Sequence, residues 1–233
     1  GTDREIAVND FAAQSWTFTD NGDGIVGRWY WTGDGATAAL VGPDGALVEA
    51  LDIASGAPIE LPEHLGLALF GVQLPDALDL RLADPDQQVR ALWYPATGEL
   101  RPWYRGPAKH ARLTRVDGDR VEYLVPDATD PNEGSLWRAD LGTGEAHELL
   151  PRIGGPIRLD DRHYFTLMDH QMVDDATFSH GAFYTYDLVL ADADTHALRR
   201  YADDVSDFTL RDGALTFLDV HGEDPGLWAV PLP

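Results

Sequence analysis

Short runs of alternating apolar and polar residues, separated by turn residues, follow one another along most of this 233-residue chain. Alternation with a period of two predicts half-buried β-strands, and two such runs joined by a turn predict an antiparallel hairpin. Four runs end in turns of similar sequence, at residues 51–56, 93–98, 139–144 and 191–196. Their equivalent positions lie 42, 46 and 52 residues apart, at Gly56, Gly98, Gly144 and His196. A period of this size in a chain of strands is typical of β-propeller blades.

A second repeated pattern lies between these turns and marks further hairpins. Pairs of apolar runs flank a short turn at Asp44-Gly45, Asp117-Gly118, Asp160-Asp161 and Asp212-Gly213. Asp-Gly between alternating strands predicts a tight hairpin, because glycine adopts a positive φ at little cost. Together the two patterns predict a unit of four antiparallel strands, which is one propeller blade. The unit is matched in full or in part at residues 38–61, 67–103, 110–150, 156–201 and 205–233.

The sequence therefore predicts an all-β protein, a single β-propeller domain over residues 1–233 with about five four-stranded antiparallel blades. Residues 4–35 lie outside the repeats, and we expect them to complete the ring by pairing with the last blade. The alternative is a single extended β-meander or an open barrel built from the same hairpins. The stretch from Arg4 to Trp16 fits either a short helix or the start of a strand.

One repeat carries a resemblance to known propellers. The stretch Leu136-Trp137-Arg138-Ala139-Asp140-Leu141-Gly142-Thr143-Gly144-Glu145 resembles the third strand and turn of TolB-like and quinoprotein-like repeats. The match covers about ten residues in each of three or four blades. The chain lacks the regular tryptophans of quinoproteins, and only Gly42-Pro43-Asp44-Gly45 is similar to the opening of a TolB-like blade. The resemblance implies a propeller architecture and no particular function.

The charge of the chain is strongly acidic, with 40 acids against 17 bases and a net charge of −23. Asp is favoured in turns, and 30 of the acids are Asp, which suits a protein rich in loops. Residues 160–233 hold 15 acids against four arginines, whereas residues 81–120 hold eight bases against five acids. Such a chain repels nucleic acid and anionic membranes and attracts a basic protein partner. Solubility or a high-salt habitat is the alternative explanation.

Other features of the composition exclude several classes of site. The absence of Cys excludes disulfides, thiolate metal sites and cysteine nucleophiles. Since no apolar run approaches the ~18 residues that span a bilayer, we expect a soluble chain with no membrane insertion. The chain begins with Gly1-Thr2, which fits a cytoplasmic protein with an altered start and an exported protein whose signal peptide has been removed.

The longest stretch that does not follow the repeat runs from Asp160 to His180. Imidazole and carboxylate together suit zinc or manganese, which makes a metal site one hypothesis for this stretch. The candidate ligands are His163, Asp169, His170, Asp174, Asp175 and His180. A protein contact and a solvated surface loop are the alternatives. No other cofactor is expected, apart from a structural calcium or other divalent ion held by Asp-rich loops such as 20–24.

The basic cluster at residues 101–120 lies close in sequence to several aromatic residues. Arginine and aromatic side chains together are typical of binding hot spots. The candidate partner-binding residues are Trp93, Trp103, Tyr104, Arg105 and Arg112. Internal charge balance is the favoured alternative, in which these arginines neutralise acids of neighbouring blades.

Catalytic motifs are scarce. The G-x-G-x-x-G at 22–27 is followed by a predicted strand, whereas a dinucleotide site needs a helix there. The chain has five serines and no G-x-S-x-G. The sequence therefore favours a non-enzymatic acidic propeller that binds a basic protein, such as an inhibitor or immunity-type protein. The alternative is a carbohydrate-active or metal-dependent hydrolase that uses carboxylates of the propeller channel.

Overall fold

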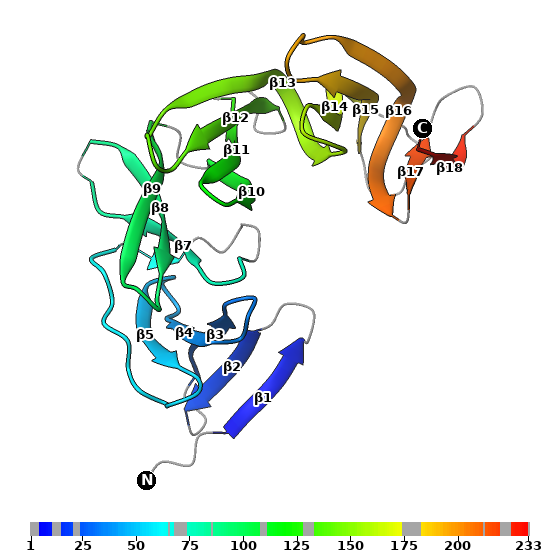
Figure 1. The fold of residues 1–233 in the computed structure, drawn as a ribbon. Coiled ribbons are helices and arrows are strands. Elements are labelled where there is room, and N and C mark those ends of the chain that lie inside the picture. Colours follow the sequence, from blue (N-terminus) through cyan, green and yellow to red (C-terminus); the bar gives the residue numbers. More distant parts are fainter. Residues whose placement is uncertain are drawn as a thin grey trace. The chain divides into compact units, whose positions relative to one another are not determined.

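A computed structural model describes residues 5–10, 15–20, 24–64, 66–67, 74–84, 86–107, 111–127, 133–173, 183–211, 213–219 and 225–232. The regular structure of these residues consists of β-strands, labelled β1 to β18 in chain order (Figure 1). Within each sheet, every strand pairs with its neighbours in sequence, and the pairs are antiparallel. The all-β antiparallel fold predicted from the periodicity is confirmed.

The strands form three sheets, and in each sheet the spatial order follows the sequence. The first sheet contains β1 (Glu5–Asp10), β2 (Ser15–Asp20), β3 (Gly24–Trp31), β4 (Thr37–Val41) and β5 (Leu47–Asp52). The second contains β6 (Gly66–Leu67), β7 (Leu78–Leu82), β8 (Gln88–Tyr94) and β9 (Glu99–Gly106). The third contains β10 (Arg112–Asp117), β11 (Arg120–Pro126), β12 (Gly134–Asp140), β13 (Ala146–Arg158), β14 (His163–Val173), β15 (Phe183–Asp192), β16 (Leu198–Arg211), β17 (Ala214–Asp219) and β18 (Gly226–Pro231).

Three of the four repeated turns share one hydrogen-bond pattern, and the fourth makes part of it. In the turn after β12, Oδ1 of Asp140 accepts the N–H groups of Gly142 and Thr143 at 2.9 and 2.8 Å. The Asp140 carbonyl accepts the N–H of Gly144 at 2.8 Å. Asp52 and Asp192 make the equivalent bonds in two other turns, whereas Tyr94 provides only the carbonyl in the fourth. The sequence repeat is therefore a structural repeat, and it accounts for part of the Asp excess.

The predicted hairpin turns also form. Gly45, Gly118 and Gly213 have φ values of 83°, 58° and 74° in the turns that follow β4, β10 and β16. These values lie in the left-handed region that glycine adopts without steric cost. Asp-Gly is therefore a reliable hairpin signal in this chain.

Strand β16 is long because it pairs with two different partners along its length. In β16, Leu198–Ala202 pair with β15 and Asp207–Arg211 pair with β17, while Val205 pairs with both. Asp204, which has a positive φ, lies next to the change of partner in β16. Strand β16 therefore ends one group of strands and begins the next.

The N-terminal strands pair with one another and with β4. A strand, β1, occupies part of the stretch for which a short helix was the alternative. Closure of a ring by residues 4–35 stays a prediction. The part of the chain that the structure describes contains no helix of the length and apolarity needed to cross a bilayer.

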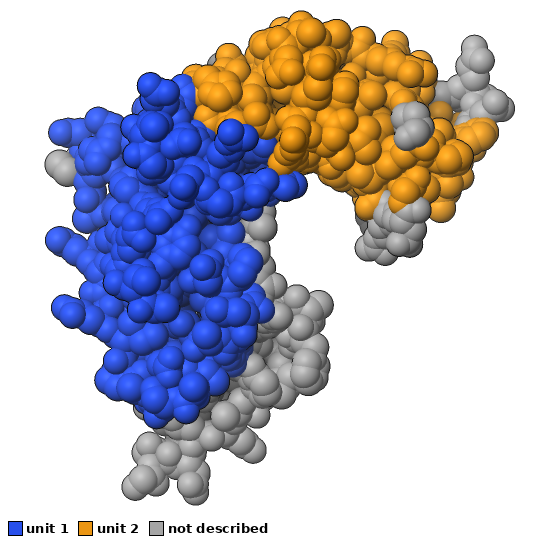
Figure 2. All heavy atoms as spheres, viewed as in Figure 1, with its two compact units in different colours: residues 1–123, 139–146 blue, residues 124–138, 147–233 orange. Residues whose placement is uncertain are grey.

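The chain divides into two compact units (Figure 2). Unit 1 comprises residues 1–123 and 139–146, and unit 2 comprises residues 124–138 and 147–233. Unit 1 has a core in which the first two sheets meet, formed by Ala39, Val41, Leu47, Ala50, Leu78, Leu80 and Trp93. Hydrophobic burial of this kind is the main stabilising contribution to a fold that lacks disulfides.

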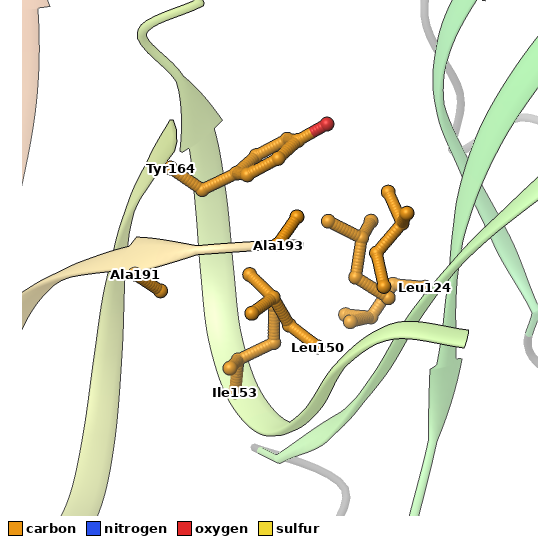
Figure 3. Packing of buried hydrophobic residues seen from close by; sticks show 8 residues of the cluster. Leu124, Leu150, Ile153, Tyr164, Ala191 and Ala193 are labelled. Atoms are coloured by element: carbon orange, nitrogen blue, oxygen red, sulfur yellow. The ribbon is translucent and has the colours of Figure 1, made fainter. Parts of the chain in front are cut away.

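Unit 2 has two such clusters. In the first, Leu124, Leu150 and Ile153 point toward one another beside the ring of Tyr164 (Figure 3). The Tyr164 hydroxyl accepts a hydrogen bond from Arg138 at 3.1 Å, so its polar end is satisfied while its ring is buried. The second cluster contains Phe165, Leu188, Val205, Leu215 and Phe217.

Candidate functional site

The candidate partner-binding residues do not share one surface. Trp93, Trp103 and Tyr104 are buried, with exposed fractions of 0%, 4% and 9%. Arg105 and Arg112 are exposed. The rings that the sequence suggested as a binding hot spot therefore contribute to the interior of unit 1.

Trp103 belongs instead to a buried ionic cluster. Asp79 of β7 accepts hydrogen bonds from Nη2 of Arg90 at 2.7 Å and from Nε1 of Trp103 at 3.0 Å. Nη1 of Arg90 donates to the carbonyl of Ala111 at 3.1 Å, and its guanidinium carbon lies 5.3 Å from the Trp103 ring centre. Burial raises the pKa of Asp79, and the pairing with Arg90 and Trp103 opposes part of that rise. The cluster ties β7, β8 and β9 to the residue before β10.

Three aromatic rings complete this part of unit 1. The ring centres of Trp103, Tyr104 and Tyr123 lie 5.2 to 6.0 Å apart in tilted and edge-on arrangements. Burial raises the pKa of Tyr123 to about 12, with a further contribution from Tyr104. Such ring geometry is typical of a packed interior.

Three arginines of the basic cluster at residues 101–120 are paired with nearby acids. Arg101 pairs with Glu99 at 2.9 Å and with Asp119 at 2.6 Å. Two more pairs join Arg105 to Asp84 and Arg115 to Asp117, each at 3.2 Å. Each of these three arginines is thus paired with an acid, and a partner-binding role for Arg105 and Arg112 stays a prediction.

The metal-site hypothesis can be followed for only part of its candidate set. Asp174, Asp175 and His180 lie outside the described residues, as does the side chain of His170. Asp169 is exposed at a position of positive φ, 51°. Within the described ranges, no three His, Cys, Asp or Glu residues are arranged to hold a metal ion. The metal site stays a prediction.

His163 belongs to an ionic cluster that joins two turns. Its Nδ1 lies 2.8 Å from Oδ2 of Asp160, and its Nε2 lies 3.8 Å from Oδ2 of Asp192. Arg162 pairs with Asp192 and lies 3.6 Å from Asp194, while its carbonyl accepts the N–H of Ala193 at 2.7 Å. The cluster therefore binds the β13–β14 turn to the β15–β16 turn.

Two carboxylates of this cluster, Asp160 and Asp192, are held in the ionised form. Hydrogen bonds from the Arg162 N–H and then from His163 lower the pKa of Asp160 to about 2. The pKa of Asp192 is lowered mainly by the hydrogen bond from Arg162. The groups that bind these two carboxylates belong to the turns themselves. The arrangement therefore holds the two turns together.

A second acidic group in unit 2 was missed by the sequence reasoning. Arg200 pairs with Asp187 at 2.9 Å and with Asp203 at 3.0 Å, and Oδ1 of Asp204 accepts a hydrogen bond from Thr185 at 3.2 Å. Burial raises the pKa of Asp187; Arg200 opposes this, and the charges of Asp169, Asp203 and Asp204 add to it. These carboxylates carry more negative charge than Arg200 neutralises. The sequence signal was the Asp203-Asp204 pair, but only the strand register places Asp187 beside it.

Comparisons with known proteins show which folds this chain is similar to. No protein-family model matches the sequence, and no curated protein matches it. A solved prolyl endopeptidase is 13% identical over 94% of this chain and 39% of its own, with a TM-score of 0.55. A protein of Listeria monocytogenes is 9% identical over 95% of this chain and 60% of its own, with a TM-score of 0.51. TolB from Acinetobacter baumannii is 12% identical over 91% of this chain and 61% of its own, with a TM-score of 0.44.

The structural neighbours of this chain are β-propeller domains. The resemblance to propeller repeats that the sequence indicates is thereby confirmed, as an architecture. At these identities the likeness shows the fold alone. The chain spans less than two thirds of the three solved proteins described above.

Proposed function

We propose that this chain is a non-enzymatic binding protein whose acidic surface recognises a basic protein partner. The observation that carries the proposal is the charge, 40 acids against 17 bases. Many of the described arginines are already paired with carboxylates, among them Arg90, Arg101, Arg105, Arg115, Arg158, Arg162 and Arg200. A large surplus of acids is left to set the field around the molecule, and such a field accelerates the approach of a cationic protein.

The carboxylates around Arg200 are the first place to test the proposal. Asp187, Asp203 and Asp204 are held on two paired strands, and the unfavourable charge among them raises the pKa of Asp187 further. A basic side chain of a partner would relieve this repulsion. An inhibitor or immunity-type protein that covers a basic partner is the specific form of the proposal.

The experiment compares wild-type protein with a triple variant, Asp187→Asn, Asp203→Asn and Asp204→Asn. Each immobilised protein captures partners from an extract of its source organism at about 0.1 M and 0.5 M salt. Captured proteins are identified by mass spectrometry, purified, and measured for association rate by surface plasmon resonance. We expect a basic partner whose association slows about tenfold with the triple variant, and to a similar degree in high salt.

A matched control removes the same number of charges from exposed acids of unit 1, with Asp76→Asn, Asp86→Asn and Glu145→Gln. We expect this control to change the association rate much less, because the surplus near Arg200 is untouched. A specific partner that binds the triple variant as fast as wild type, and binds equally well at about 0.5 M salt, overturns the proposal.

The finer architecture belongs to the same proposal. We infer about five blades of four antiparallel strands, supported by the repeated turns and by the change of partner along β16. The prolyl endopeptidase neighbour, with a TM-score of 0.55, supports the propeller fold on which this inference rests.

A further inference from the structure

Strand β18 is the last strand of the third sheet (Figure 1), and it is apolar. Among the described residues it pairs only with β17, and the pairs run without a register shift. No residue of β18 is charged, and Leu227 and Trp228 are 75% and 42% exposed. Proteins usually protect such an edge with charges, prolines or bulges, because an uncovered edge can accept another strand. Of these features β18 has only Pro231, at its end.

The backbone groups of β18 that face away from β17 follow from the pairing. The N–H of Leu232 donates to the carbonyl of Gly213 at 2.9 Å, which makes these two residues a hydrogen-bonded pair. Bonded and non-bonded pairs alternate along an antiparallel ladder, and Pro231, which has no N–H, falls at a non-bonded position. The same alternation turns the N–H and carbonyl groups of Leu227 and Ala229 outward, along the edge of the sheet.

The two faces of β18 continue two different rows of side chains. Residues directly opposite each other on paired strands lie on the same face. Trp228 is opposite Phe217, which belongs to the second core cluster of unit 2. Leu227 is opposite Leu218, which is opposite Asp207, and these three residues are exposed. A strand added to β18 therefore extends the core row with every second side chain and the exposed row with the side chains between them.

The charge around this edge favours one kind of strand. Residues 203–224 hold seven acids and one arginine. This surplus attracts a basic segment and repels a second copy of the chain, which carries the same net charge of −23. The first strand of the chain, β1, pairs with β2 in a different sheet. A segment of a basic partner is therefore the occupant that these observations favour.

We propose that β18 binds an extended segment of a basic protein partner by strand addition. The outward N–H groups of Leu227 and Ala229 donate to carbonyls of the added strand, whose own N–H groups donate to the outward carbonyls of β18. Apolar side chains of the segment lie beside Trp228, and basic side chains alternate with them on the exposed face. The basic character of the partner rests on the proposed function, whereas the edge at which it binds is inferred from β18 itself.

Amide hydrogen exchange, followed by NMR for each residue of the free full chain, tests whether the edge is open. We expect the amides of Leu227 and Ala229 to exchange about tenfold faster than those of Trp228 and Val230, which bond to β17. Equal exchange at all four positions overturns the proposal. If all four are slow, analytical ultracentrifugation identifies what covers the edge, which is a segment of the same chain in a monomer and a second copy in a dimer.

Three synthetic peptides of equal length test the occupant. In the first, valine alternates with lysine; in the second, valine alternates with glutamate; the third has the composition of the first with its valines grouped together. We expect only the first to slow exchange at Leu227 and Ala229, by about tenfold. If no peptide slows it, strand addition is wrong and the proposed function is unaffected. If the glutamate peptide acts as well as the lysine peptide, strand addition is supported and a basic partner is contradicted.

A variant removes one outward hydrogen bond. Ala229→Pro deletes an N–H that β17 does not use, and Ala229→Val, which keeps the N–H, is the matched control. We expect Ala229→Pro to weaken binding of the valine–lysine peptide about tenfold, and Ala229→Val to change it less than about twofold. Equal binding by the two variants contradicts strand addition. Urea unfolding shows whether each variant is folded, and the exchange measurements on wild type decide the matter if Ala229→Pro is not.

Discussion

His196 occupies a backbone position that the other three repeated turns give to glycine. Its φ is 57°, against 69°, 72° and 75° for Gly56, Gly98 and Gly144. A side chain in this left-handed region meets steric cost, although His tolerates it better than branched residues do. The exposed His196 therefore holds strain that its three equivalents avoid.

We expect His196→Gly to stabilise the protein by about 0.5 kcal/mol, because relief of strain exceeds the added freedom of the unfolded chain. Urea denaturation followed by circular dichroism measures the change. The reciprocal control is Gly144→Ala, where an added Cβ meets no atom within 4 Å, so that only backbone strain acts. Gly144→Ala should lower the free energy of unfolding by about 1 kcal/mol. A loss of stability in His196→Gly would show that its side chain contributes contacts.

Among individual residues, we expect substitutions in the Asp79–Arg90 pair to change the free energy of unfolding most. Their side chains are 4% and 10% exposed, so removal of Arg90 leaves a buried carboxylate without its cation. We expect Arg90→Met to lower the free energy of unfolding by about 3–5 kcal/mol. The double variant Asp79→Leu with Arg90→Met should lower it clearly less. A double-mutant cycle in urea measures both. Additive losses would contradict the expected coupling.

At the scale of elements, the turns and hairpins were predictable and the buried cluster was not. Asp-Gly and Thr-Gly depend on local backbone preferences, which a sequence displays directly. Strand β8 is buried on both faces, so alternation gives no sign that Trp93 and Arg90 point inward. Asp79 lies 11 residues from Arg90 and 24 from Trp103, and only the strand register brings them together.

The same distinction applies to the candidate sites. Glu99 and Arg101 are two positions apart on one strand, so they share a face, and their pairing follows from the period of a strand. The group around Arg200 combines residues of β15 and β16 across a register shift, which no local pattern reveals. Interactions within a strand or turn are thus readable from sequence, whereas those between strands require the register.

Carboxylates in four of the turns make the fold sensitive to acid. Hydrogen bonds from the turn N–H groups and side chains lower the pKa of Asp52, Asp140, Asp160 and Asp192. A lowered folded-state pKa adds stability above the ordinary pKa near 4, and this stability is lost as the pH falls through the folded-state value. We expect stability to drop between about pH 4 and pH 2, the range that the value of about 2 for Asp160 defines.

Urea denaturation at a series of pH values measures this slope. Asp160→Asn removes one titrating group and should make the slope shallower, because the amide oxygen still accepts the turn N–H groups without binding a proton. Asp86→Asn, at an exposed position, should leave the slope unchanged. Equal slopes in all three proteins would mean that the turn carboxylates do not control the acid transition.

At the scale of the whole molecule, the net charge of −23 works against the folded state. Repulsion among like charges is screened by salt over about 10 Å at 0.1 M, so added salt should raise the melting temperature. We expect a rise on the order of 2–4 °C for each kcal/mol of repulsion removed, measured by thermal scans from about 10 mM to 0.5 M NaCl. KCl should act equally, since screening depends on ionic strength.

The melting temperature of the variant with Asp187→Asn, Asp203→Asn and Asp204→Asn should rise less with added salt than that of wild type. A melting temperature that falls with salt would mean that ion pairs such as Arg101–Glu99 stabilise the fold more than the acidic surplus destabilises it.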